Sequence, residues 1–165
     1  MAERNLNILD AVEIAMEAEL KANKFYSDAV KTASNERGKD LLKQLANFEL
    51  NHYHKLEELR HSLQKEGEFI EYKGTSFETF KSSDPSKASG KIEQNREDVL
   101  QILSMAIDAE TKAHERYRKM GDETTDPMGK EMFLKLADEE TLHRRILSDE
   151  FYQLSNQGSV WIWGD

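Results

Sequence analysis

Two stretches of the sequence decide how the chain folds: Leu-Ala-Asn-Phe-Glu-Leu-Asn-His at residues 45–52 and Leu-Ala-Asp-Glu-Glu-Thr-Leu-His at residues 136–143. The second begins 91 positions after the first (45 against 136), and each has a histidine three residues after a glutamate. The same offset aligns Ala-Glu-x-x-Ala-x-x-x-Tyr at residues 18–26 with an identical pattern at residues 109–117. Because two separate motifs repeat at one offset, we predict that the chain is a duplicated helical hairpin.

Apolar residues recur at spacings of three and four in four segments, which predicts four amphipathic helices. We place these helices at residues 8–33, 36–65, 92–120 and 126–154. Asn7 is the predicted N-cap of the first helix, and Gly67 and Gly121 mark the ends of the second and third. Asp126 followed by Pro127 is a typical start for the fourth helix.

The connections between these helices predict their arrangement. The first and third connections are only a few residues long, so each joins an antiparallel helical hairpin. The connection at residues 68–90 reaches some 80 Å when extended, whereas a 30-residue helix is about 45 Å long. It can therefore return along the bundle. The predicted fold is all-α: one domain of residues 1–156, a four-helix bundle of two antiparallel hairpins joined by a long crossover.

A short apolar tail, residues 157–165, follows the predicted bundle. It contains Trp161 and Trp163 on either side of Ile162. Exposed clusters of large apolar side chains are unfavourable in water and typical of contact surfaces. We therefore expect the tail to be ordered, either folded back on its own bundle or packed against a second subunit of a homodimer.

Composition excludes several classes of function. The formal net charge of -9 and the pI near 5.1 argue against nucleic-acid binding, which requires basic surfaces. No apolar run approaches the ~20 residues that span a bilayer, and residues 1–10 lack the apolar core of a signal peptide. We expect a soluble cytoplasmic protein with no membrane partner. Since there is no cysteine, a metal site must use glutamate, aspartate and histidine, which suits iron, manganese or zinc.

Six polar residues interrupt the apolar stripes of the four helices and are therefore predicted to point into the core. A buried carboxylate without a partner is costly, and four of them together require a compensating charge. Two divalent cations balance four carboxylates and two neutral imidazoles, and this is the ligand pattern of di-iron carboxylate bundles. We predict two iron ions, with manganese or zinc as substitutes, bound by Glu19, Glu49, His52, Glu110, Glu140 and His143.

Other interpretations of these residues are less consistent with the pattern. A single Glu-x-x-His pair is common on the polar face of a helix, so the prediction depends on the whole repeated set. The zinc-protease motif does not fit, because Phe48 and Glu139 precede the glutamates where histidine is required. Tyr26 and Tyr117 lie two turns from the lone glutamates. They are core aromatics, or else their hydroxyls bond a carboxylate of a neighbouring helix or carry a redox equivalent.

With these motifs, the sequence resembles the rubrerythrin family of ferritin-like di-iron proteins over about residues 7–155. The resemblance implies non-haem iron, chemistry with O₂ or peroxide, and frequent dimers. Rubrerythrins proper also have a rubredoxin-like domain with four cysteines, which this chain lacks, so the electron donor is expected to be a separate protein. They also have a second glutamate on the third helix, which takes part in a redox-linked shift of one iron. Ala113 stands at that position here, so the predicted six-ligand site is more symmetric, as in bacterioferritin-like centres.

Three functions are consistent with this pattern. The first is an oxidoreductase that reacts with peroxide or O₂, in which the glutamates of the Glu-x-x-His motifs bridge the ions and the lone glutamates cap them. The second is a ferroxidase or iron-handling protein that takes Fe²⁺ as its substrate. The third is a structural bundle with a vestigial metal site.

Overall fold

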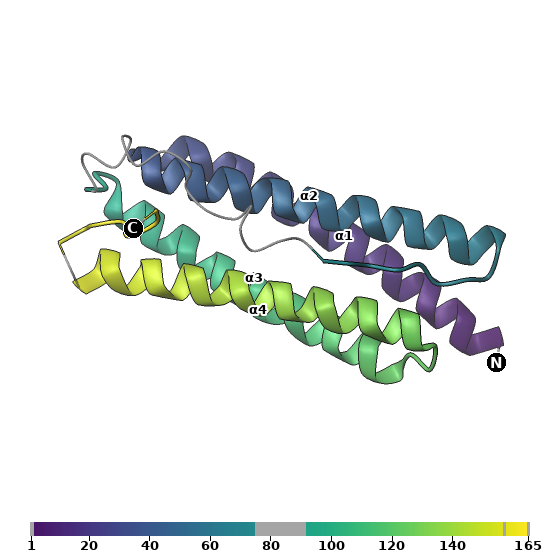
Figure 1. The fold of residues 1–165 in the computed structure, drawn as a ribbon. Coiled ribbons are helices and arrows are strands. Elements are labelled where there is room, and N and C mark those ends of the chain that lie inside the picture. Colours follow the sequence, from purple (N-terminus) through teal and green to yellow (C-terminus); the bar gives the residue numbers. More distant parts are fainter. Residues whose placement is uncertain (1, 75–91, 157, 165) are drawn as a thin grey trace.

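The computed structural model describes residues 2–74, 92–156 and 158–164 and contains four long helices (Figure 1). They are α1 (Ala2–Thr32), α2 (Glu36–Lys65), α3 (Arg96–Glu123) and α4 (Pro127–Asn156). In the described part of the chain, the one β-type pairing is an isolated bridge between Ile92 and Val160. The predicted all-α four-helix bundle is confirmed.

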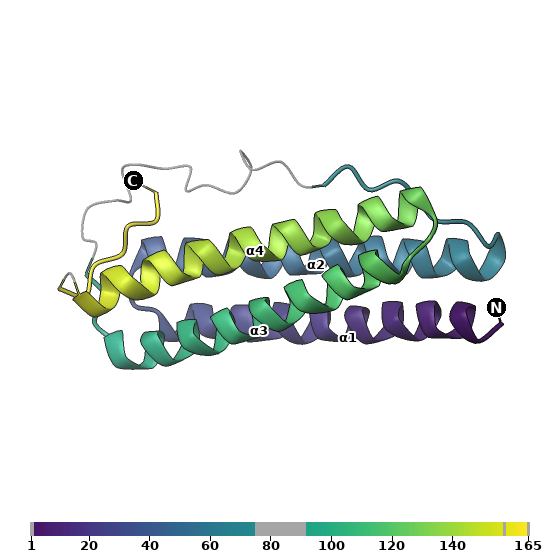
Figure 2. The same cartoon turned by 90° about the horizontal axis from the view of Figure 1, so that it is seen from below.

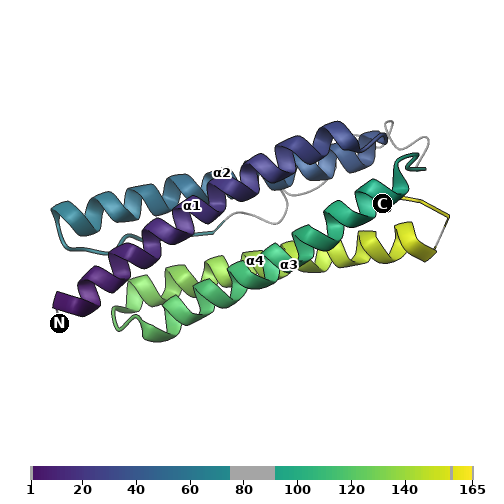
Figure 3. The same ribbon diagram turned by 180° about the vertical axis from the view of Figure 1, so that it is seen from behind.

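The two hairpins lie against each other. Helix α1 packs along α2, α3 packs along α4, and α1 also contacts α3. Figure 2 shows α2 beside α4 and α1 beside α3, and Figure 3 shows α1 and α3 from the opposite side to Figure 1. The chain leaves α2 at the end of the bundle opposite the start of α3 (Figure 1). The start and the end of this connection therefore lie at opposite ends of the bundle. None of the helices in the described ranges is both long and apolar enough to cross a membrane.

The predicted duplication extends to contacts that hold each hairpin together. The Lys39 ammonium group donates to the carbonyl oxygen of Val30 at 2.7 Å. In the second hairpin, Lys130 donates to the carbonyl oxygen of Gly121 at 2.9 Å. Both members of the second pair stand 91 positions after their counterparts in the first (39 against 130, 30 against 121). The second helix of each hairpin is thus tied to the first in the same way.

The segments that follow α2 and α4 also pack in a related manner. Phe69, after α2, lies against Gly129 of α4, where an added Cβ would come within 2.5 Å of its ring. Trp161, after α4, lies against Gly38 of α2, where an added Cβ would come within 2.4 Å of the indole. Each aromatic needs a glycine for this close approach. The tail therefore folds back on its own bundle, and Trp161 is fully buried there.

Buried Glu93 organises the end of the bundle where α3 begins. Its carboxylate accepts hydrogen bonds from the backbone and hydroxyl of Ser34 and from the indole of Trp161, at 2.7–3.1 Å. Ile92 meanwhile forms the bridge to the tail. These contacts hold residues 92 and 93 in a non-helical conformation. The predicted start of the third helix at residue 92 is therefore wrong, and α3 begins at Arg96.

Other helix boundaries differ in smaller ways. Helix α1 begins at Ala2, so the predicted N-cap at Asn7 is wrong; four of the five residues 2–6 are good helix formers. The prediction that Gly121 marks the end of the third helix is wrong, because α3 continues to Glu123. Gly121 instead lies against the Leu134 side chain, where there is no room for a Cβ. The start of α4 is confirmed: Asp126 Oδ1 accepts the backbone N–H groups of residues 128 and 129 at 2.9 and 3.0 Å.

Two apolar clusters fill the bundle. One contains Leu45 and Leu103, and the other contains Leu56 and Leu136. The described part of the crossover adds Tyr72 to the second cluster, with Phe69 and Ile70 packed against it. The remaining aromatics of the predicted crossover, Phe77 and Phe80, lie outside the described residues.

Candidate metal centre

The six predicted ligands come together at the middle of the bundle. Helices α1 and α3 contribute one glutamate each, and α2 and α4 contribute a glutamate and a histidine each, three residues and so about one turn apart. All six side chains point inward because they continue the apolar stripes of their helices. Each is exposed by 2% or less of its surface: Glu19, Glu49, His52, Glu110, Glu140 and His143.

The six residues form two overlapping clusters. The first contains Glu19 and His52, and the second contains Glu110 and His143; both clusters contain Glu49 and Glu140. Within each cluster, one ligand atom from every residue lies within 4.8 Å of the others. We call Glu49 and Glu140 the shared glutamates and Glu19 and Glu110 the outer glutamates. Two neighbouring sites that have two residues in common are what a pair of metal ions with shared ligands would require.

The histidines face the clusters through the same ring atom. Nδ1 of His52 lies 2.9 Å from Glu140 Oε1 and 3.4 Å from Glu19 Oε1. Nδ1 of His143 lies 3.0 Å from Glu49 Oε1 and 3.6 Å from Glu110 Oε2. Each histidine therefore meets the shared glutamate of the opposite hairpin, and the pseudo-twofold relation of the sequence is preserved in the site.

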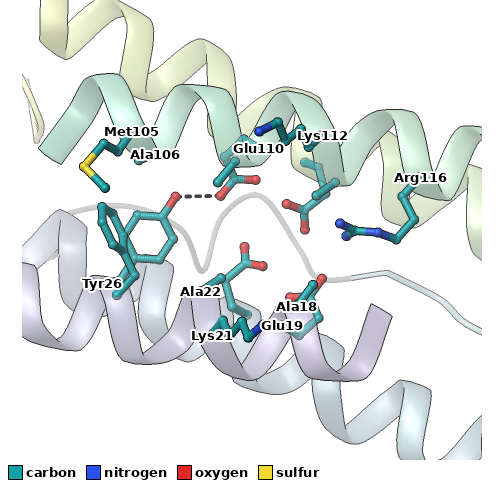
Figure 4. Close-up of a pocket in the computed structure, with 15 residues that line it drawn as sticks. Ala18, Glu19, Lys21, Ala22, Tyr26, Met105, Ala106, Glu110, Lys112 and Arg116 are labelled. Carbon is teal, nitrogen blue, oxygen red and sulfur yellow. Dashed lines mark hydrogen bonds between the residues drawn. The ribbon is translucent and has the colours of Figure 1, made fainter. Parts of the chain in front are cut away.

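The two tyrosines bond the outer glutamates reciprocally across the bundle. The Tyr26 hydroxyl on α1 donates to Glu110 Oε1 on α3 at 2.7 Å, as Figure 4 shows. The Tyr117 hydroxyl on α3 donates to Glu19 Oε1 on α1 at 2.6 Å. Both rings are fully buried, and burial together with the neighbouring carboxylates raises the pKa of both phenols well above the usual value. Of the alternatives above, the structure shows the hydrogen bond to a neighbouring helix.

The pKa shifts within the cluster show that it favours positive charge. Burial, and then the nearby carboxylates, raise the pKa of both shared glutamates well above the ordinary value. Burial opposes ionisation of the outer glutamates as well, but the histidines and hydrogen bonds lower their pKa overall. Burial lowers the pKa of His52, yet Glu19 and other carboxylates raise it well above normal. Four carboxylates so close together thus favour either protons or cations among them.

Unsatisfied atoms of the cluster provide a direct test of whether metal ions fit. Among the described residues, one carboxylate oxygen of each glutamate is buried with no hydrogen-bond partner. These are Glu19 Oε2, Glu49 Oε1, Glu110 Oε2 and Glu140 Oε1. A histidine Nδ1 lies within 3.0 Å of Glu49 Oε1 and of Glu140 Oε1, but neither contact is a hydrogen bond. Buried polar atoms normally have partners, so orphaned oxygens at one point indicate a missing ligand. Hard oxygen donors with imidazole nitrogen suit iron, manganese or zinc.

A residue pair that the sequence interpretation missed supports His52 from outside the cluster. Nε2 of His52 lies 3.6 Å from Glu139 Oε1, and the Tyr72 hydroxyl bonds both oxygens of Glu139 at 2.6 and 3.0 Å. The side chain of Glu139 is only 12% exposed. A carboxylate behind a histidine fixes the orientation of the ring and raises its basicity as a ligand. Glu139 and Tyr72 therefore make the surroundings of His52 different from those of His143.

The duplication provides the sequence signal that could have revealed this difference. Glu139 aligns with Phe48 at the 91-residue offset, and the Phe48 ring packs edge-on against His143 with centroids 4.4 Å apart. An aromatic thus stands where the second half of the chain has a carboxylate. Departures from an internal repeat point to residues with a specialised role, and Glu139 is such a departure.

His114 lies outside the metal clusters. Its Nδ1 is 3.0 Å from the carbonyl oxygen of Ala137 and 2.7 Å from the Thr141 hydroxyl. In the first hairpin, the equivalent Asn23 donates to the carbonyl oxygen of Ala46 at 2.7 Å. His114 therefore links two helices, as Asn23 does.

The fold and the buried carboxylate–histidine clusters together define a ferritin-like four-helix bundle. A family model described as Rubrerythrin matches residues 101–160, a segment that contains Glu110, Tyr117, Glu140 and His143. The resemblance to rubrerythrins is thereby confirmed. A solved structure of a hypothetical protein from Pyrococcus furiosus is similar, with a TM-score of 0.70, 23% sequence identity and 90% of each chain covered. That similarity shows the fold alone. No curated protein matches the chain significantly.

Proposed function

We propose that the chain is a non-haem di-iron oxidoreductase that reacts with peroxide or O₂ at this centre. The observation that carries the proposal is the pair of buried clusters with two glutamates in common. Two divalent ions would cancel the charge of four buried carboxylates. The rubrerythrin match over residues 101–160 supports iron as the metal.

Each residue of the clusters has a role in this proposal. The shared glutamates would hold both ions, the outer glutamates would each hold one, and each histidine would complete one site through Nδ1. Two ferrous ions would supply the two electrons that reduce peroxide to water, and two protons are required as well. The tyrosines hold one oxygen of each outer glutamate, which would leave the other oxygen available to bind a metal ion. Since the chain has no cysteine, we propose that a separate donor protein supplies electrons.

The intact ligands and their hydrogen bonds favour a bound pair of metal ions over a vestigial site. A cluster that had lost its metal would keep the cost of four buried glutamates without any gain, and apolar replacements would stabilise the bundle. All six ligands and both tyrosine hydrogen bonds are present. An iron-handling protein would have the same ligands, so the reaction itself must separate the first two candidates.

The experiment compares two reactions of protein purified and loaded with iron without oxygen. Peroxide is added in the presence of a chemical reductant, and oxidation of excess Fe²⁺ is measured in parallel. Glu49→Ala is the inactive control, and Glu13→Gln, on the exposed face of α1, is the matched surface control. Repeated peroxide consumption that Glu49→Ala abolishes supports the proposal. Turnover of Fe²⁺ without peroxide reduction would instead assign iron handling.

A further inference from the structure

A cavity of about 330 Å³ lies between α1 and α3, on the side of the centre opposite the histidines of α2 and α4. Its walls extend from the exposed side chains of Lys21 and Met105 to buried Glu19 and Glu110. It therefore connects the surface to the metal clusters. Cavities for organic ligands are about 300–1,000 Å³, whereas a single water needs only ~10–15 Å³. This cavity is larger than peroxide or O₂ requires.

Small residues create this space. Five alanines line the cavity, two from α1 and three from α3: Ala18, Ala22, Ala106, Ala109 and Ala113. Ala113 is the position at which rubrerythrins, by the resemblance above, have a second glutamate on the third helix. The methyl group of alanine leaves open a volume that a glutamate side chain would fill. The departure from the family pattern therefore coincides with the cavity.

The two ends of the cavity differ in chemistry. Tyr26 and Met105 lie at one end and Arg116 at the other, with Glu110 between them (Figure 4). Phe25 also lines the cavity, and its ring packs edge-on against Tyr26 with centroids 5.7 Å apart. Met105 and Arg116 are eleven residues apart on α3, or roughly 16 Å along the helix axis. The cavity is thus an elongated slot with an apolar end and a cationic end.

Arg116 is the cation best placed to receive an anionic group. It is only partly exposed and, among the described residues, forms no ion pair. Lys21 and Lys112 also line the cavity, but each pairs with an acidic residue on its own helix, at 3.4 and 3.0 Å. Arginine binds carboxylates through two parallel hydrogen bonds, which a lysine does not provide.

We propose that this slot binds an aliphatic carboxylate, with its head group at Arg116 and its chain along α1 and α3 toward Phe25 and Met105. The four glutamates already balance the charge of two divalent ions, so the loaded centre offers an anion no net positive charge. The head group therefore stays at the cationic end while the apolar chain passes over the clusters. This inference rests on the proposed function in one respect only: it takes the two metal ions next to the slot to be present. An aliphatic carboxylate is thus the class of molecule that would lie next to the outer glutamates.

The test measures binding of decanoate to the zinc-loaded full-length protein by calorimetry. Zinc keeps the centre occupied without redox chemistry. Arg116→Gln removes the anchor for the head group, and Ala113→Leu fills the slot. Lys119→Gln removes one positive charge from the same helix outside the cavity and is the matched control. Circular dichroism and zinc content establish that each variant is folded and metal-loaded.

We expect saturable binding of one decanoate per chain. Arg116→Gln should weaken it by about tenfold or more, the effect of losing a charge-assisted hydrogen bond. Ala113→Leu should abolish it, and Lys119→Gln should leave it unchanged. If Ala113→Leu does not fold, Arg116→Gln decides the matter alone.

Absence of saturable binding would overturn the proposal, as would an unchanged affinity in Arg116→Gln, because the carboxylate would then be bound elsewhere. If a second copy of the chain covers the slot instead, the protein should be a dimer that decanoate does not dissociate. That result would also overturn the proposal. Zinc content separates this outcome from failure of the metal centre. A protein with two zinc ions and no decanoate binding leaves the proposed di-metal function standing.

Discussion

The hydrogen bond from Tyr117 to Glu19 offers a sharp test of how the bundle prepares its metal ligands. The two oxygens are 2.6 Å apart, in the range of strong hydrogen bonds to ionised carboxylates, and both side chains are buried. Tyr117→Phe removes the hydroxyl and keeps the ring. Hydrogen bonds to charged groups contribute about 1.5–3 kcal/mol, and loss of an outer partner of a metal ligand typically costs about 10–100-fold in affinity. The two figures agree, since 1.4 kcal/mol is about tenfold.

We therefore expect Tyr117→Phe to weaken binding of one metal ion by about 10–100-fold and to leave the other nearly unchanged. The assay is a two-site titration with Zn²⁺ in competition with a chelator. Tyr26→Phe should have the equivalent effect on the other ion, through Glu110. Tyr53→Phe is the control, because that hydroxyl makes only a long, exposed contact of 3.4 Å.

Wild-type affinity for both ions in Tyr117→Phe would refute the reasoning, because the hydroxyl would then not orient a ligand. Equal weakening of both ions would also contradict it, since the outer glutamates belong to different clusters. The double variant should lose affinity at both sites additively, provided that the two tyrosines act independently.

Three further predictions follow from the site and the tail. Metal-free protein should lose stability as the pH rises above 4.5, the ordinary pKa of glutamate. The reason is that the shared glutamates, whose pKa is raised, keep protons that the unfolded chain releases. The outer glutamates, whose pKa is lowered, have the opposite effect, but only below pH 4.5. Thermal melts should show this decline, and bound metal should remove it; a flat metal-free profile would contradict the assignment. Glu139→Gln should weaken metal binding mainly at the His52 cluster, by about 10–100-fold, whereas exposed Asp138→Asn should not. Trp161→Ala should lower the free energy of unfolding by about 3–5 kcal/mol by chemical denaturation; a change as small as that of exposed Tyr152→Ala would mean that the tail adds nothing to the fold.

Much of the fold follows from local patterns along the chain. Apolar spacing placed four helices, and the cap at Asp126 with Pro127 located the start of α4 correctly. The start of α3 could not be found in this way, because Glu93 is held out of the helix by Ser34 and Trp161. These partners are 59 residues before Glu93 and 68 residues after it, and single-sequence periodicity carries no information on such contacts.

The convergence of the candidate ligands was predictable for a different reason. A charged residue inside an apolar stripe must point into the core, and the 91-residue repeat showed which of the many acidic residues belong to the set. The position of Tyr72 behind Glu139 was not predictable, since it depends on the path of the crossover. The slot between α1 and α3 likewise depends on how far two helices separate, which alanine positions alone do not determine.

The account as a whole depends on two metal ions that share Glu49 and Glu140. The most direct test is the metal content of protein purified without oxygen, determined by elemental analysis of the wild type and of Glu49→Ala and Glu140→Ala. We predict two ions per chain in the wild type, iron when the metal is native, and one or none in each variant. Two ions bound at unchanged affinity in either variant would contradict the account.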